Sequence, residues 1–136
     1  MSNTITTKLK GITSGAMAEF ENVAPIKVVA KSLLEKHQGA WSPVHMLVSS
    51  VETCFFVTLL AIAEKAHVEI KAYESSAEAE MGLKDGKHSA ITSITIRPKV
   101  ELADENDRQK LPNLFKKAEE YCTVGNSLNF TARILI

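Results

Sequence analysis

The chain contains two cysteines, Cys54 and Cys122, and each belongs to a segment with the apolar pattern of a helix. Cys54 begins the apolar run CFFVTLLAIA, and Cys122 closes the amphipathic segment LPNLFKKAEEYC. A thiol that an oxidant converts to a sulfenic acid can be captured by a second thiol as a disulfide. Two cysteines that are distant in sequence but meet in the fold would suit this redox chemistry.

Length and composition place these cysteines on one small scaffold. The chain has 136 residues and is 45% hydrophobic, which predicts a single domain over residues 1–136. Its 16 basic and 16 acidic side chains cancel, and no Lys/Arg cluster stands out. The field that concentrates nucleic acid or anionic lipid is therefore missing, and we expect no nucleic-acid partner.

The N-terminal stretch MSNTITTKLK lacks the apolar segment of a signal peptide. The longest apolar run, near Cys54, is about half of the roughly 20 residues that a membrane span needs. We therefore expect a cytoplasmic protein without a membrane partner. In that reducing compartment, a bond between Cys54 and Cys122 would be transient and chemical rather than structural.

The first third of the chain reads as a small antiparallel sheet followed by a loop. The expected strands are Thr4–Leu9, Ala16–Phe20 and Ile26–Lys31, with a turn at Gly11–Gly15 and a loop over residues 32–41. Ser42 and Pro43 then predict a helix start, because a serine hydroxyl can accept a free backbone N–H and proline fits the first helical position. This helix should run to about Ala66. It is apolar on nearly every side between Cys54 and Ala63, so protein must cover it all round.

The remaining chain predicts a hairpin, a second helix and a final strand. Strands are expected over Val68–Met81 and His88–Leu102, with Asp85-Gly86 as a two-residue turn between them. In the first of these, the alternation of Val68, Ile70 and Ala72 indicates one buried face. Residues 111–122 keep the three-and-four spacing of an amphipathic helix, with Pro112 near its true start, and the tail alternates from Phe130 to Ile136.

This order of elements indicates an α+β fold with small antiparallel sheets around two helices, one of them long and buried. A chain this short cannot easily cover a helix that is apolar all round. A second copy could do so, and we expect an intertwined homodimer.

Two segments carry a resemblance to a known family. SPVHMLVSSVETCFF, with a cysteine eleven residues after the proline, precedes AEEYCTVGNSL, and together they resemble the OsmC/Ohr family of osmotically inducible and organic hydroperoxide resistance proteins. The resemblance extends from about Ile26 to the C-terminus. It implies an OsmC-like fold, a homodimer and a thiol peroxidase that reduces organic hydroperoxides. By this resemblance Cys54 matches the peroxidatic cysteine and Cys122 the resolving one.

The sequence departs from that family at the groups that activate the thiol. Burial in apolar surroundings raises a thiol pKa, so a cation or a strong donor is needed to keep the thiolate. The well-studied members supply an Arg from the N-terminal region and a Glu near the start of the long helix. Here Val44 occupies the Glu position, and no Arg precedes Arg97. His45, Lys27 and Lys31 are alternatives among which the sequence does not choose.

Two functions from different classes follow. The first is a peroxidase that reduces organic hydroperoxides through a Cys54 sulfenic acid resolved by Cys122, with an external dithiol as reductant. The second is a non-catalytic or weakly active protein that binds a small apolar ligand or senses oxidation. Without CxxC or HxxxH spacing we expect no metal, and nothing implies a cofactor. Glu52 reads as a solvated or interface charge pointing away from Cys54.

Overall fold

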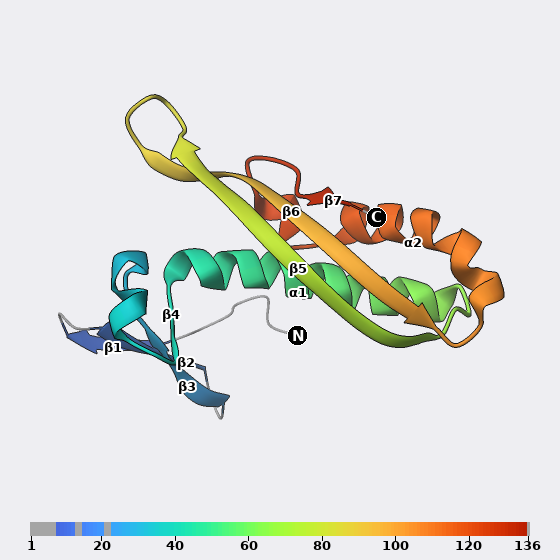
Figure 1. The fold of residues 1–136 in the computed structure, drawn as a ribbon, viewed down its shortest axis with the longest axis horizontal. Helices are drawn as coiled ribbons and strands as arrows, with labels where there is room; N and C mark the ends of the chain where they lie inside the picture. The colour runs from blue at the N-terminus through green and yellow to red at the C-terminus, as the bar shows by residue number, and fades with distance from the viewer. Residues whose placement is uncertain (1–7, 13–14, 21–22, 136) are drawn as a thin grey trace. The chain divides into compact units, whose positions relative to one another are not determined.

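The computed structural model describes residues 8–12, 15–20 and 23–135, and it divides into two compact units, Met1–Leu47 and Val48–Ile136. The first contains a small sheet, and the second contains a long hairpin with two helices (Figure 1). The prediction of an α+β fold with two helices and small sheets is confirmed.

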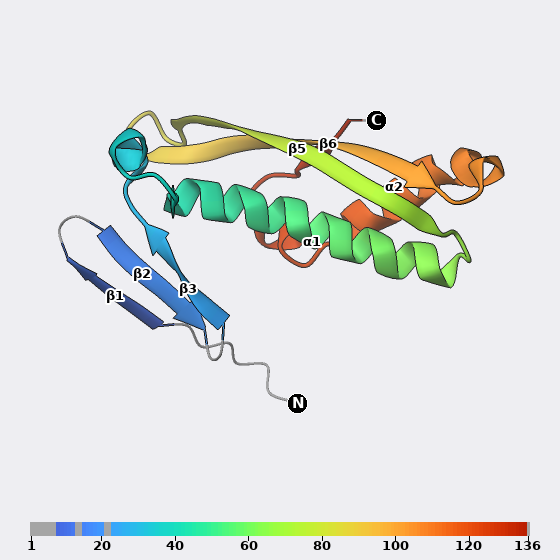
Figure 2. The same cartoon turned by 60° about the horizontal axis from the view of Figure 1, so that its bottom comes forward.

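The sheet of the first unit has the order β1-β2-β3-β4. Figure 2 shows its first three strands side by side. Its strands are β1 (Lys8–Ile12), β2 (Gly15–Phe20), β3 (Val23–Val28) and β4 (Ala40–Trp41). The first three pair antiparallel, as expected, whereas β4 pairs parallel with β3. The expected strand over Thr4–Leu9 lies partly outside the described residues, and the third strand begins three residues before the predicted Ile26. A 3-10 helix, Lys31–Lys36, occupies part of the predicted loop.

Helix α1 (Pro43–Lys65) starts where the sequence predicts and ends one residue before the expected Ala66. Ser42 is fully buried, and its hydroxyl oxygen accepts the His45 backbone N–H at 3.1 Å. The Ser42 carbonyl accepts the Met46 N–H at 2.9 Å and so makes the first bond of the helix. Serine capping and proline at the first position together fix this start.

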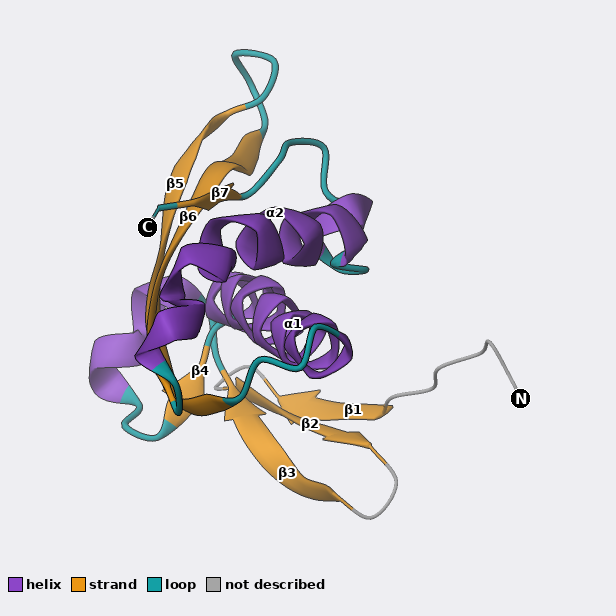
Figure 3. Cartoon of the chain, turned by 90° about the vertical axis from the view of Figure 1, so that its right-hand side faces the viewer, coloured by secondary structure: helices purple, strands orange, loops and turns teal. Residues whose placement is uncertain are grey.

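The second unit has a sheet of order β5-β6-β7, and both helices cover the same face of it (Figure 3). Strands β5 (Ile70–Leu83) and β6 (Ser89–Leu102) pair antiparallel over their whole length, and β7 (Arg133–Ile134) pairs parallel with β6. Helix α2 (Leu111–Tyr121) follows a 3-10 helix, Glu105–Lys110, and precedes another, Gly125–Ser127. The predicted strand over residues 130–136 is thus much shorter, and Ile136 lies outside the described residues.

The core of this unit lies between the two helices and the hairpin. Helix α1 contributes a stripe at four-residue spacing, namely Val51, Phe55, Leu59 and Ala63. Phe55 packs against Phe115 of α2 with ring centroids 5.9 Å apart. Ile94 and Ile96 of β6 are fully buried beneath both helices.

Two details of the hairpin differ from prediction. A bulge between Ile70 and Ala72 shifts the alternation of β5, so Ala72 is exposed and Tyr73 turns to the helices instead. The turn is also longer than the two residues expected from Asp85-Gly86. Lys84 N–H bonds the His88 carbonyl at 3.0 Å, and the Asp85 carboxylate accepts the His88 N–H at 2.8 Å. This side-chain bond organises a wider loop than a two-residue turn.

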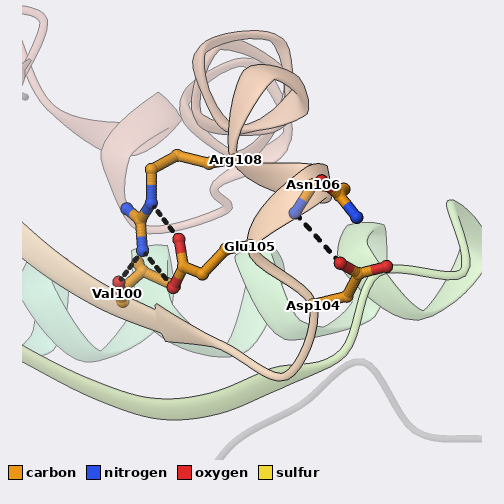
Figure 4. Close-up of polar contacts among 5 residues, drawn as sticks. All are labelled: Val100, Asp104, Glu105, Asn106 and Arg108. Atoms are coloured by element: carbon orange, nitrogen blue, oxygen red, sulfur yellow. Dashed lines mark hydrogen bonds and ion pairs between the residues drawn. The ribbon is translucent and has the colours of Figure 1, made fainter.

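Polar contacts anchor the segment between β6 and α2 (Figure 4). Arg108 makes an ion pair with Glu105 at 2.6 Å and donates to the Val100 carbonyl at 3.1 Å. Asp104 caps the 3-10 helix by accepting the Asn106 N–H at 3.0 Å. These contacts set the direction in which α2 begins, and therefore where its far end places Cys122.

Within this chain α1 is not covered all round. Val57 is 52% exposed and Leu60 39%, on faces away from the buried stripe. The most apolar 18-residue window of α1 has a mean hydropathy of 2.0, so the helix is long and apolar enough to cross a membrane, as the core helices of soluble proteins also can be. The prediction of no membrane partner rested on the shorter apolar run from Cys54 to Ala63 alone.

Candidate functional site

The two cysteines come from different helices of the second unit. Cys54 lies in the middle of α1 and is half-buried, whereas Cys122 is buried, with 4% of its surface exposed. Cys122 is the residue directly after α2, and its backbone is extended, with φ −71° and ψ 108°. The chain therefore leaves the helix at Cys122 and turns back toward α1.

The turn after α2 contacts both sulfur atoms. The Val124 N–H donates to Cys54 Sγ at 3.5 Å, and the Gly125 N–H donates to Cys122 Sγ at 3.4 Å. Both cysteines are free thiols in this state. The structure thus brings together two residues 68 positions apart, as the sequence analysis requires of a two-thiol site.

The surroundings shift the two thiols in opposite directions. Burial raises the pKa of Cys54, but hydrogen bonds from the Val124 N–H and from the Cys122 thiol, with smaller ones from Thr58 and the Thr123 N–H, outweigh it and lower that pKa. Burial raises the pKa of Cys122, and the neighbouring Cys54 raises it further. Cys54 is therefore the better thiolate, and Cys122 stays protonated beside it.

Among these donors the Val124 N–H is the main stabilising group. Thr58 has a single hydroxyl proton, and Thr58 Oγ1 donates it to the Cys54 carbonyl at 2.7 Å. That proton is therefore not free for the sulfur. The backbone N–H of Val124, in contrast, points at Cys54 Sγ. A neutral backbone amide thus stands where the sequence analysis sought a cation.

Gly125 lets the turn pass close to Cys122. A Cβ atom at position 125 would lie 3.3 Å from Cys122 Sγ and 3.5 Å from its Cβ. That separation is tighter than ordinary van der Waals contact, so a larger residue would push the thiol or the turn aside. The glycine therefore helps to hold the Cys122 sulfur in place.

The charge at Glu52 has a role that the sequence analysis missed. Its carboxylate accepts a hydrogen bond from the Ser75 hydroxyl of β5 at 2.5 Å, so it is not a freely solvated charge. Nearby, Tyr73 packs on Phe56 with ring centroids 4.6 Å apart. Burial, and then the charge of Glu52, raise the pKa of Tyr73. This cluster joins α1 to β5 through Glu52 and Phe56, which lie two residues before and two residues after Cys54.

The three alternatives for an activating group, His45, Lys27 and Lys31, all belong to the first unit. His45 Nδ1 lies 2.6 Å from the Ser42 hydroxyl oxygen. Lys27 Nζ lies 3.3 Å from His37 Nδ1. Lys31 is the first residue of the 3-10 helix that follows β3.

In the part of the chain that the structure describes, no three His, Cys, Asp or Glu side chains gather as metal ligands. The sulfur contacts instead come from backbone N–H groups, which leave no mark in a sequence. The one available signal was Gly125, three residues after Cys122, which marks a turn at the end of α2.

The second unit is thus an α+β fold in which the thiol of a long helix lies beside the end of a second helix, where the other cysteine is. The family model of OsmC-like proteins matches residues 36–135. The chain belongs to the OsmC-like family, as its resemblance suggested. A comparison with curated proteins found no match.

Solved structures share the fold at low sequence identity. An OsmC-like protein of unknown function from Vibrio cholerae is 16% identical, with a TM-score of 0.89 and 99% of each chain covered. The organic hydroperoxide resistance protein OhrB of Bacillus subtilis is also 16% identical, with a TM-score of 0.73, and the match covers 96% of this chain and 94% of that one. An organic hydroperoxide resistance protein OsmC from Legionella pneumophila is 15% identical, with a TM-score of 0.73 and coverage of 96% and 93%. The family thus includes hydroperoxide resistance proteins.

Proposed function

We propose that this protein is a thiol-dependent peroxidase that reduces organic hydroperoxides. The observation that carries the proposal is the meeting of Cys54 with Cys122 at one turn, with the pKa of Cys54 lowered and that of Cys122 raised. Membership of a family that includes hydroperoxide resistance proteins supports the same reading. Cys54 is the proposed peroxidatic residue and Cys122 the proposed resolving residue.

The cycle has three balanced steps. The Cys54 thiolate attacks the terminal oxygen of the peroxide, the O–O bond breaks, and the alkoxide leaves as an alcohol after taking a proton. Cys54 is then a sulfenic acid. The Cys122 sulfur attacks Cys54 Sγ, water leaves, and a disulfide forms. An external dithiol reduces that disulfide and restores both thiols.

In this cycle the Val124 N–H replaces the Arg and Glu that the sequence lacks at the family positions. A neutral N–H stabilises a thiolate by a charge-assisted hydrogen bond without adding a full positive charge. It donates to Cys54 Sγ from the turn that also carries Cys122. Activation of the first thiol and placement of the second thus depend on the same few residues.

We also propose that the working form is a homodimer. Val57, one turn after Cys54 on α1, is 52% exposed, and Leu60 and Leu47 of the same helix are each 39% exposed. A second copy that covered this helix would bury apolar area, which favours association. It would also place an apolar wall beside Cys54, which suits an organic peroxide better than hydrogen peroxide.

Steady-state turnover tests the proposed reaction. Reduced protein with a dithiol should consume cumene hydroperoxide continuously, and faster than hydrogen peroxide at the same concentration. The dithiol oxidised should equal the peroxide consumed, because each cycle transfers two electrons. Consumption no faster than with dithiol alone would contradict the proposal.

Sedimentation velocity tests the dimer. The wild-type protein should sediment with about twice the 14.9 kDa mass of one chain. Val57→Asp should shift it toward the monomer, because a carboxylate cannot be buried in an apolar interface without a partner. Ser76→Asp, which adds the same charge on an exposed position of β5, is the control and should remain dimeric. A wild-type monomer at micromolar concentration would remove the dimer from the account.

A further inference from the structure

A cavity of about 240 Å³ lies on the Cys122 side of the site. Its inner wall consists of buried apolar side chains, Val51 and Phe55 of α1 and Ile96 of β6. Its rim carries the polar and more exposed residues Glu119 and Asn126. The cavity is thus apolar inside and polar at its mouth, and it is of a size that admits a small molecule.

Hydrogen bonds hold the rim of this cavity in shape. Asn126 Nδ2 donates to the Glu120 carbonyl at 3.0 Å, and the Asn126 backbone N–H donates to the Cys122 carbonyl at 2.9 Å. The Ser127 hydroxyl donates to the Thr123 carbonyl at 3.0 Å. The turn that carries both sulfur contacts is therefore also one wall of the cavity.

The cavity reaches only one of the two cysteines. Cys122 and Gly125 line it, whereas Cys54 does not. A molecule seated there would meet the sulfur of Cys122 first. Exposure alone favours the opposite sulfur, since Cys54 is half-buried and Cys122 is 4% exposed. The position of the cavity and the exposure of the residues thus make opposite predictions about which sulfur is attacked.

The chemistry of thiol exchange supports attack on Cys122, the cysteine that lines the cavity. When a thiolate attacks a disulfide, the sulfur that leaves fastest is the one whose thiol has the lower pKa. The pKa of Cys54 is lowered and that of Cys122 is raised. Attack on Cys122 therefore expels the better leaving group, and the Val124 N–H already points at the sulfur that receives the electron pair.

We propose that this cavity is the docking site of the dithiol reductant and that the reductant attacks the Cys122 sulfur of the Cys54–Cys122 disulfide. The inference rests on the proposed function, because it assigns a place to the last step of that cycle. One thiolate of the reductant bonds to Cys122 Sγ, the Cys54–Cys122 bond breaks, and Cys54 leaves as a thiolate. The second thiol of the reductant then loses its proton and attacks the reductant's first sulfur, which is bonded to Cys122. Cys122 is released as a thiol, and the reductant leaves as a cyclic disulfide.

The charge of the cavity lining also determines which reductants bind well. Glu119 is the charged residue among those that line the cavity. A neutral or cationic thiol is therefore favoured over an anionic one. A single half-buried charge in the lining changes the rate of attack by about threefold for each thiol at moderate ionic strength.

A trapping experiment decides which sulfur is attacked. The disulfide is first formed with diamide, so its formation does not depend on any reaction with peroxide. The oxidised protein is mixed with 2-mercaptoethanol, quenched with acid after short intervals, alkylated and digested for peptide mass spectrometry. The earliest adduct should carry mercaptoethanol on Cys122 with Cys54 free to be alkylated. An earliest adduct on Cys54 would overturn the proposal, as would failure of diamide to join the two cysteines.

A charge series tests the cavity itself. Reduction of the disulfide by cysteamine should be faster than by mercaptoacetate, after correction for the thiolate fraction of each. Glu119→Gln should lower the cysteamine rate and raise the mercaptoacetate rate, about threefold each. Glu120→Gln removes the same charge from the neighbouring residue, which does not line the cavity, and should leave both rates unchanged. Equal effects of the two substitutions would overturn the docking site. Absence of peroxidase turnover alongside these results would reject the proposed function and leave the exchange chemistry standing.

Discussion

Replacing Cys54 by serine should abolish hydroperoxide consumption while leaving the protein folded. A serine hydroxyl is not ionised near neutral pH and cannot accept an oxygen atom to form a sulfenic acid, so the first step of the cycle is lost. Cys54 is only half-buried, and serine is nearly the same size, so the melting temperature should change little. The measurement is dithiol-dependent consumption of cumene hydroperoxide, with circular dichroism to follow folding.

The matched control is Cys122→Ser. It retains the peroxidatic thiol and loses only the second one, so a single equivalent of peroxide should still be consumed rapidly. The product should be a trapped Cys54 sulfenic acid without an intramolecular disulfide. Equal loss of the first reaction in both variants, or unchanged turnover in Cys54→Ser, would contradict the assigned roles.

Replacing Val124 by proline should slow the reaction of Cys54 with hydroperoxide about tenfold at neutral pH. Proline removes the N–H that donates to Cys54 Sγ, and a hydrogen bond to a charged group contributes about 1.5 kcal/mol or more. The backbone of Val124 has φ −67°, which is the angle that proline itself prefers, so the turn can accept the ring. The single-turnover rate of the reduced protein gives the measurement.

The pH dependence of the single-turnover rate shows whether the loss of the Val124 N–H causes the slower reaction. In the wild-type protein the pKa of Cys54 is lowered, so its thiolate is present at pH values where an ordinary thiol is protonated. Without the amide the thiolate is lost at these pH values, and the rate profile should move to higher pH. Val124→Ala keeps the N–H and removes only side-chain atoms, so its profile should coincide with the wild type. A shift of the same size in both variants would mean that packing, and not the amide, sets the reactivity.

Much of the fold could be predicted because its signals are local. Ser42-Pro43 marks the start of α1, and the spacing of Leu114, Phe115 and Ala118 marks the buried face of α2. The bulge at Ile70–Ala72 could not be predicted, because it depends on how β5 pairs with β6 across the hairpin. Hydropathy likewise does not say which faces of α1 one chain buries, and in this chain Val57 and Leu60 remain exposed.

The two cysteines of the candidate site could be predicted from the sequence, but the backbone N–H groups that donate to their sulfur atoms could not. Cys54 and Cys122 stand out by residue type, and their segments carry the family resemblance. The Val124 N–H, in contrast, is a backbone group, and any residue except proline would supply it. Charged side chains can be read from the sequence, so His45 and the two lysines were the predicted alternatives. The turn beside Cys122 carries no such side chain, and its N–H donor was not predicted.

Mass spectrometry of the fully reduced protein, exposed briefly to one equivalent of an organic hydroperoxide, tests the central claim most directly. Digestion without reductant shows which sulfur atoms have reacted and whether they have joined. A single disulfide between Cys54 and Cys122, formed within the mixing time and before any methionine is oxidised, is the result that the proposed cycle requires. Unreacted cysteines, or slow oxidation of methionines instead, would contradict the cycle and favour a protein that has kept the OsmC-like fold to bind a small apolar ligand.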